Sequence, residues 1–362
     1  MRIDSISAEP FSLPLLEPFA IARVSVDTTR AVLVRARVVD GSNAVEGVGE
    51  CALPLRAAEE PDDLARVIAS AAASLEGSVV DDVVALTRLV DGARVEPPVA
   101  RCGLHAALLD GLARLSGAPV HVLLGSETRA PRPLVTDITL PIAEPSHLAD
   151  LARAHWARGF RIFKVKVGRD LASDRRTVRL VAGATPSATL RFDANEGFGA
   201  DESLALLAHA RELGVHVDCF EQPCARDDLD GIRRVREEGG GVPVVADESV
   251  RDLADLDRLV AARAVDGVNL KLVKTGGIDR CLALGRAAQE RGLRLMVGAM
   301  VESRLGLTAM AHVAAALGGA DWVDLDTAFL LARDRCRGGF HAEGATLSLP
   351  DAPGFAITVE AA

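Results

Sequence analysis

The sequence predicts an α/β fold, a parallel (β/α) barrel preceded by a smaller α+β domain. Three observations predict it: short apolar runs that end at a charged residue, a regular spacing of these residues, and helical patterns between them. Buried parallel strands form such apolar runs, and the catalytic side chains of a (β/α) barrel lie at the carboxyl ends of its strands. The runs are at residues 163–167, 190–193, 219–221, 244–247 and 268–271.

The N-terminal region, residues 1–125, lacks this spacing and predicts an α+β capping domain. Alternating segments predict strands at 5–13, 30–39 and 44–50, and amphipathic segments predict helices at 61–75, 83–89 and 99–115. The segments 18–24 and 49–54 are interpreted as loops that close over the mouth of the barrel and exclude water.

The barrel is expected over residues 126–335, after a junction that contains Pro131 and Pro133. Its successive strand-end charges are 29, 28, 26 and 24 residues apart. Each interval fits one strand, one helix and two short loops. Helical patterns at 203–213, 253–264 and 277–292 fall inside these intervals, as a barrel requires.

The composition excludes several classes of protein. A net charge of −10 without a basic cluster argues against nucleic acid and anionic membrane as partners. No secretory signal and no apolar run of about 18 residues is visible, so we expect a cytoplasmic protein. The six cysteines are dispersed and are interpreted as small buried side chains. His312 lies in a helical pattern and is interpreted as a helix position before a ligand.

Three of the strand-end residues are carboxylates, namely Asp193, Glu221 and Asp247. On neighbouring strand ends they would form an anionic pocket rich in oxygen, which repels itself when empty and suits a hard divalent cation such as Mg²⁺. We therefore predict these three residues as metal ligands.

Lysines are expected on two opposite walls of the same pocket. Lys164 and Lys166 share one face of a strand because side chains alternate, and Lys271 lies four strands further around a barrel of about eight. A nearby dication, a second ammonium and burial would all lower a lysine pKa, so that part of the population can act as a base. This arrangement predicts removal of a proton next to a carboxylate, through an enediolate that the metal stabilises.

Five ordered motifs resemble the enolase superfamily, and among its branches the muconate-lactonising subgroup. The motifs are FKVKVG at 163–168, RFDAN at 191–195, FEQP at 220–223, ADES at 246–249 and NLKLVKTGG at 269–277. The resemblance implies a (β/α)₇β barrel, a capping domain completed by the C-terminal segment 336–362, and one Mg²⁺ per subunit. It also implies that Lys166 and Lys271 are the acid/base pair and that Lys164 holds the substrate carboxylate. Asn195 and Glu248 would be polar supports of the metal site.

Within the subgroup, the sequence resembles dipeptide epimerases. Asp324 and Asp326 lie on one face of the last expected strand and suit the free α-ammonium group of a dipeptide, and the segment 297–303, which includes Met300, resembles the same branch. We therefore predict two-base 1,1-proton transfer at the α-carbon of the C-terminal residue. Arg23 is a candidate contact for the substrate side chain.

Alternatives remain at this stage. The same subgroup contains N-acylamino acid racemases, o-succinylbenzoate synthases and cycloisomerases, and a barrel that only binds a metabolite is the alternative from another class. A single Lys-x-Lys or Asp-x-Asp pair is usually a solvated strand end, and an aspartate after a strand is often a helix N-cap. The expected partner is a dipeptide, without nucleic acid or membrane, and a homo-oligomer stays open.

Overall fold

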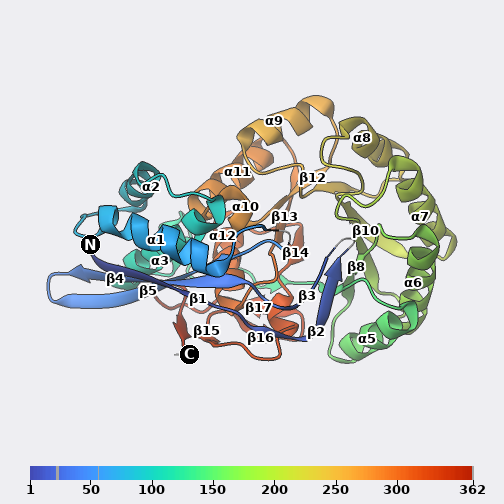
Figure 1. Cartoon of the computed structure of the whole chain (residues 1–362). Coiled ribbons are helices and arrows are strands. Elements are labelled where there is room, and N and C mark those ends of the chain that lie inside the picture. Colours follow the sequence, from blue (N-terminus) through green and yellow to red (C-terminus); the bar gives the residue numbers. More distant parts are fainter. Residues whose placement is uncertain (22–23, 56, 361–362) are drawn as a thin grey trace.

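The computed structural model describes residues 1–21, 24–55 and 57–360 of the chain. Figure 1 shows two parts: a ring of helices around central strands on the right, and a flat sheet with its own helices on the left. The N-terminus lies on the side of the flat sheet.

The ring is a (β/α)₇β barrel, as predicted. Its eight strands are parallel neighbours in chain order. They are β7 (Ile138–Leu140), β8 (Ile162–Lys166), β9 (Thr189–Asp193), β10 (His216–Glu221), β11 (Val244–Ala246), β12 (Gly267–Leu270), β13 (Arg294–Gly298) and β14 (Trp322–Asp324). The outer helices between them are α5 (Pro145–Ala157), α6 (Leu171–Ala184), α7 (Ala200–Glu212), α8 (Leu229–Glu238), α9 (Leu253–Ala262), α11 (Ile278–Glu290) and α12 (Arg304–Ala316).

Local sequence explains where several of these helices begin. Asp170, Asp228 and Asp252 precede α6, α8 and α9, and each side chain accepts a hydrogen bond from a backbone N–H of the first turn. Such a cap satisfies one of the N–H groups that a helix leaves without a partner. The helices predicted at 203–213, 253–264 and 277–292 are confirmed to within three residues.

The barrel closes through bonds between the chain around β14 and the chain around β7. Asp137 N donates to Val323 O at 3.1 Å, and Leu325 N donates to Thr136 Oγ1 at 2.9 Å. These segments are nearly 190 residues apart in the sequence. Below the mouth, four buried side chains from β10, β11, β13 and β14 pack in the barrel interior: Cys219, Val245, Met296 and Trp322. The barrel interior below the mouth therefore contains a packed apolar cluster.

The capping domain contains an antiparallel sheet and helices in the predicted order. The sheet consists of β1 (Arg2–Pro10), β4 (Ala31–Asp40) and β5 (Asn43–Ala52), and the helices are α1 (Pro61–Leu75), α2 (Val83–Gly92) and α3 (Pro98–Leu115). Gly47 and Gly49 let α3 approach the sheet, because an added Cβ would lie 2.1 Å from a backbone oxygen of this helix. Arg101 of α3 then binds Asp279 of α11 at 2.7 Å, which joins cap and barrel.

The interpretation of residues 18–24 as a loop was wrong for the described part. They belong to a hairpin of β2 (Pro14–Ile21) and β3 (Val24–Thr28), in which Phe19 pairs with Val26. The backbone of β2 also bonds to the barrel, since Ala20 O accepts from Ile142 N at 2.8 Å. The sequence of β2 contains two prolines and does not predict a strand. The strand forms because contacts with distant segments stabilise it.

The remaining segments connect the two parts. They are α4 (Val120–Leu123), β6 (Leu134–Val135), α10 (Leu272–Thr275), the 3₁₀ turn η1 (Thr327–Phe329), β15 (Cys336–Gly338), β16 (His341–Glu343), β17 (Thr346–Ser348) and β18 (Ile357–Val359). The C-terminal segment reaches the cap, where Arg114 Nη2 donates to Ile357 O at 2.6 Å. The domain limits 1–125, 126–335 and 336–362 stay predictions.

The structure also shows the places of the cysteines and of His312, for which no chemical role was predicted. All six cysteines are free and buried, as expected. His312 lies within α12 and stacks on His121. Within the described part of the chain, no helix combines the length and apolar character that a membrane span requires.

Glu50, in β5, forms a second buried link between cap and barrel. Its carboxylate accepts hydrogen bonds from Ser303 N and Gly306 N, both at 3.1 Å, at the start of α12. Burial raises the pKa of Glu50 to about 7. Burial, and then Glu50, raise the pKa of Glu302 to about 8. Both carboxyl groups therefore bind protons more tightly in the folded state than in the unfolded chain.

This link predicts that the folded state loses stability as the pH rises from about 5 to 8. In this window, unfolding releases a proton from each carboxyl group whose pKa is raised in the folded state. The stabilisation is therefore complete at a pH below the pKa of the unfolded chain, and it is lost as the pH rises through the pKa of the folded state. Glu302→Gln should reduce the slope of the unfolding free energy plotted against pH by up to about 1.4 kcal/mol per pH unit. Urea unfolding at several pH values measures the slope. Glu343→Gln on exposed β16 is the control, and an unchanged slope in Glu302→Gln would contradict the prediction.

Candidate active site

The strand ends bring the predicted charged side chains to one level at the mouth of the barrel. Lys166 of β8, Asp193 of β9 and Glu221 of β10 are register partners across neighbouring strands. Asp247 and Lys271 directly follow β11 and β12. The side chains are buried, with Lys166 the most exposed at 8 %. The fold thus brings these five side chains together at one place, as the sequence predicts.

Ion pairs connect the lysines with the three carboxylates. Lys166 Nζ lies 2.5 Å from Asp193 Oδ2, and Lys271 Nζ lies 2.9 Å from Asp247 Oδ2. Lys164 Nζ lies between two of the carboxylates, 3.1 Å from Asp193 Oδ2 and 2.6 Å from Glu221 Oε2. Lys166 and Lys271 come from strands four places apart in a sheet of eight. They therefore stand on opposite walls of the mouth.

The three carboxylates fit a hard divalent cation. They offer oxygen atoms at adjacent strand ends, and their side chains are at most 5 % exposed. Glu221 Oε2 is buried and accepts no hydrogen bond, because Lys164 Nζ is close to it but outside hydrogen-bonding geometry. Carboxylate oxygens with free acceptor capacity in a closed site are the ligands that Mg²⁺ prefers.

Polar neighbours hold these carboxylates in place. Asn195 N donates to Asp193 Oδ1 at 2.9 Å, and Asn195 Nδ2 donates to Glu248 Oε1 at 3.2 Å. Asn195 has a φ of +42°, a left-handed conformation that asparagine tolerates better than most residues. Asn269 Nδ2 donates to Glu221 Oε1 at 2.7 Å. Asn195 and Glu248 thus lie where supports of the site were predicted.

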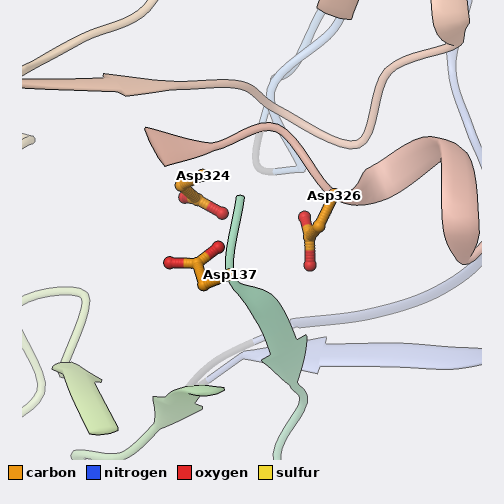
Figure 2. Close-up of side chains that lie close together, drawn as sticks. All are labelled: Asp137, Asp324 and Asp326. Carbon is orange, nitrogen blue, oxygen red and sulfur yellow. The ribbon is translucent and has the colours of Figure 1, made fainter. Parts of the chain in front are cut away.

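A second acidic cluster lies beside this set (Figure 2). One oxygen each of Asp137, Asp324 and Asp326 lies within 4.8 Å of the other two. Asp137 Oδ2 accepts from Arg191 Nη1 at 2.9 Å, and Asp326 Oδ2 accepts from Thr139 N at 2.5 Å. The oxygens of Asp137 and Asp326 that these groups bind are difficult to free, because a guanidinium keeps its charge and a backbone N–H has a fixed position. A lysine has a flexible side chain, so its ammonium can move away from a carboxylate. The lysine-paired carboxylates of the strand-end set can therefore be freed for a cation more easily than Asp137 and Asp326, and their role as metal ligands stays a prediction.

Asp324 and Asp326 both line the cavity at the mouth of the barrel. Lys164 Nζ donates to Asp324 Oδ2 at 2.6 Å. Burial raises the pKa of Asp324, but Lys164, Lys271 and Lys166 together outweigh burial and lower it. Burial, and then Asp324, raise the pKa of Asp326 to about 6. Asp326 Oδ1 is buried without a hydrogen-bond partner, which leaves an acceptor for a cationic group. Asp326 precedes η1 but makes no side-chain cap, so the N-cap alternative is wrong for this residue.

The expected fall in lysine pKa is not produced by the protein side chains. Burial lowers the pKa of Lys271, but Asp247 and Glu221 outweigh it and raise the pKa. The pKa of Lys164 is likewise raised, because Asp324 and Glu221 outweigh burial. In return, Lys166 and Lys164 outweigh the burial of Asp193 and hold its pKa at about 2. The local charges therefore favour the ionised forms of Lys164 and Lys271.

Sequence reasoning missed several residues of the site. Lys274 Nζ donates to Asp247 O at 2.7 Å and to Asn269 O at 3.0 Å, and it also contacts the Asp247 carboxylate. Gln222 Oε1 accepts from Asp247 N at 3.0 Å. Gln222 lies in the FEQP motif and Lys274 in the NLKLVKTGG motif. Their positions in these motifs could have identified them as site residues. The chain has four lysines, at 164, 166, 271 and 274, and all four lie in this site.

Two predicted candidates remain, Met300 and Arg23. Met300 lines the cavity, and its contact with a substrate stays a prediction. Arg23 lies outside the described residues.

Comparison with known protein families agrees with this fold. Residues 6–125 match the mandelate racemase / muconate lactonizing enzyme N-terminal domain, and residues 147–362 match the enolase C-terminal domain-like family. The chain therefore belongs to the mandelate racemase and muconate lactonizing enzyme group of the enolase superfamily.

Similar individual proteins include epimerases of dipeptides. The chain is 36% identical to an aromatic dipeptide epimerase of Herpetosiphon aurantiacus, over 99% of both chains. Its structure resembles the substrate-liganded L-Ala-D/L-Glu epimerase of Bacillus subtilis with a TM-score of 0.92, 29% identity and complete coverage of both chains. It also resembles a dipeptide epimerase of Cytophaga hutchinsonii complexed with Mg and D-Ala-L-Val, with a TM-score of 0.91 and 29% identity over 99% and 96% of the two chains.

Proposed function

We propose that this protein is a Mg²⁺-dependent dipeptide epimerase that inverts the α-carbon of the C-terminal residue by two-base 1,1-proton transfer. One observation carries the proposal: lysines on opposite walls flank a carboxylate cluster that fits a divalent cation, beside a buried carboxylate oxygen that has no partner. The relatives support it, since similar proteins are named dipeptide epimerases and one is complexed with Mg and a dipeptide.

The site residues divide into three roles. Asp193, Glu221 and Asp247 would hold Mg²⁺, which when bound stabilises negative charge on the substrate carboxylate. Lys164, at the centre of the cluster, would bind an oxygen of the same carboxylate. Asp324 and Asp326 would bind the free α-ammonium group, so that both ends of the dipeptide are fixed.

Lys166 and Lys271 carry out the proton transfer. A substrate fixed at both ends exposes one face of its α-carbon to each lysine. One lysine, in its neutral form, removes the α-proton, and the enediolate forms. The ammonium of the other lysine then delivers a proton to the opposite face, which inverts the configuration. Each turnover moves one proton in and one out, so no other reagent is consumed.

The proposal predicts that solvent deuterium enters the α-carbon of dipeptides only when Mg²⁺ is present. Mass spectrometry of L,L-dipeptides in D₂O measures incorporation, and chelation should stop it until Mg²⁺ is restored. Asp247→Asn should lower the rate by about 10²-fold or more, because a metal ligand is lost. Asp257→Asn, which removes an exposed carboxylate paired with Arg291, is the matched control. Full exchange without metal would refute the metal requirement, and faster reaction of N-acylamino acids would favour an acylamino acid racemase.

A second readout does not depend on turnover. Because all four lysines lie in the site, selective ¹⁵N-lysine labelling gives side-chain signals from this site alone. Adding Mg²⁺ should shift these signals in the wild type and in Asp257→Asn, and much less in Asp247→Asn.

A cytoplasmic location and a homo-oligomeric assembly are further proposals. The composition of the chain supports the location, and the assembly stays a prediction. Size-exclusion chromatography coupled to light scattering measures the assembly state.

A further inference from the structure

The cavity above the charged residues has a wall of different chemistry. It has a volume of about 200 Å³, and its floor carries the lysines and carboxylates described above. Its wall is apolar and comes from three separate segments: Phe19 and Ile21 of β2, Pro54 and Leu55 after β5, and Ala299 to Val301 after β13. Cap and barrel therefore both contribute to the wall.

Hydrogen bonds hold two of the three segments that form this wall, β2 and the segment after β13. Ala20 O, between the two β2 side chains, accepts from Ile142 N at 2.8 Å. Leu16 N, in the same strand, donates to Leu330 O at 2.9 Å. Met300 N donates to Glu302 Oε1 at 2.9 Å. The wall is thus held in place before a substrate arrives, and preformed apolar surface of this kind selects apolar ligand groups.

The cations that line the cavity in addition to Lys164, Lys166 and Lys271 already have anionic partners. Arg226 Nε and Nη2 donate to the two carboxylate oxygens of Glu196, at 2.9 and 2.7 Å. Lys274 is bound to Asp247. Among the described residues that line the cavity, each positive side chain therefore has a carboxylate partner. An acidic substrate side chain placed against the apolar wall would lose water without gaining a free cation.

We propose that the enzyme prefers dipeptides with apolar side chains, which pack against the wall formed by Phe19, Ile21, Leu55 and Met300. This inference rests on the proposed function and specifies its substrate class. The polar floor binds the main-chain charges that all dipeptides share, so the discrimination between dipeptides depends on the wall. Leucine or phenylalanine at the epimerised position would remove apolar surface from water on both partners.

The test compares kcat/KM for L-Ala-L-Leu, L-Ala-L-Phe, L-Ala-L-Glu and L-Ala-L-Lys in D₂O. We expect the two apolar substrates to exceed the two charged ones by about tenfold or more. Phe19→Ala and Met300→Ala should each raise KM for L-Ala-L-Leu about tenfold and change L-Ala-L-Ala much less, because only the larger side chain reaches the wall. Leu16→Ala, an exposed position of the same hairpin, is the control and should leave both substrates unchanged.

The outcomes separate this inference from the proposed function. Equal rates for all four dipeptides, or a preference for L-Ala-L-Glu, would overturn the inference and leave the epimerase intact. A preference for L-Ala-L-Glu that Arg23→Ala abolishes would assign the selection to that arginine instead of the wall. Failure of every dipeptide to exchange deuterium would overturn the proposed function, and the substrate class with it.

Discussion

Lys166→Ala and Lys271→Ala are each expected to reduce epimerisation by about 10²- to 10⁴-fold, the usual contribution of a positioned acid or base. The two variants should nevertheless differ in exchange. Because the lysines stand on opposite walls, each removes only the α-hydrogen that points toward it. Lys166→Ala should keep α-deuterium exchange from one epimer, and Lys271→Ala should keep exchange from the other. Proton NMR of each pure epimer in D₂O, with the wild type in parallel, measures both rates.

Two controls separate this effect from general damage to the site. Arg66→Ala removes an exposed cation far from the reaction and should retain full activity. Both lysine variants should still bind the dipeptide with Mg²⁺, measured by calorimetry, because the metal ligands and the Asp324–Asp326 pair are intact. Exchange from both epimers in either lysine variant would refute the assignment of one base to each face.

The ammonium site is expected to produce the second large effect. Asp326→Asn should lower kcat/KM for a free dipeptide by about 10²-fold, because a buried charge pair would lose one partner. N-acetylation of the dipeptide removes the ammonium and should cost a similar factor with the wild-type protein. If Asp326 acts through the ammonium, the two losses do not add, and the N-acetyl dipeptide reacts at similar rates with wild type and variant. Steady-state kinetics on both substrates complete this cycle.

Asp326 is the better position for this test than Asp324. Asp324 also binds Lys164 at 2.6 Å, so its replacement would disturb the lysine that faces the substrate carboxylate. Asp227→Asn, an exposed aspartate paired with Arg258, is the matched control. Additive losses in the cycle would show that Asp326 acts on something other than the α-ammonium.

The amino-acid sequence determined the barrel and its strand-end charges, because both depend on short-range rules. Side-chain alternation places Lys164 and Lys166 on one face, and each strand-helix unit ends at the same edge of the sheet. Asp193, Glu221, Asp247 and Lys271 could therefore be found from spacing alone, and helices such as α1 were located to the residue. Membership of the family follows from the same ordered motifs.

The tertiary structure decided what depends on contacts between distant segments. The β2 strand, the junction of Glu50 with α12, and the apolar wall each join residues that are more than 100 positions apart. Asp137 reaches Asp324 and Asp326 only because the chain around β7 meets the chain around β14 when the barrel closes. Strand periodicity reports which face a side chain takes within its own element, but it carries no information about the partner segment. For that reason the reaction could be inferred from the sequence, whereas the side of the cavity that selects the substrate required the fold.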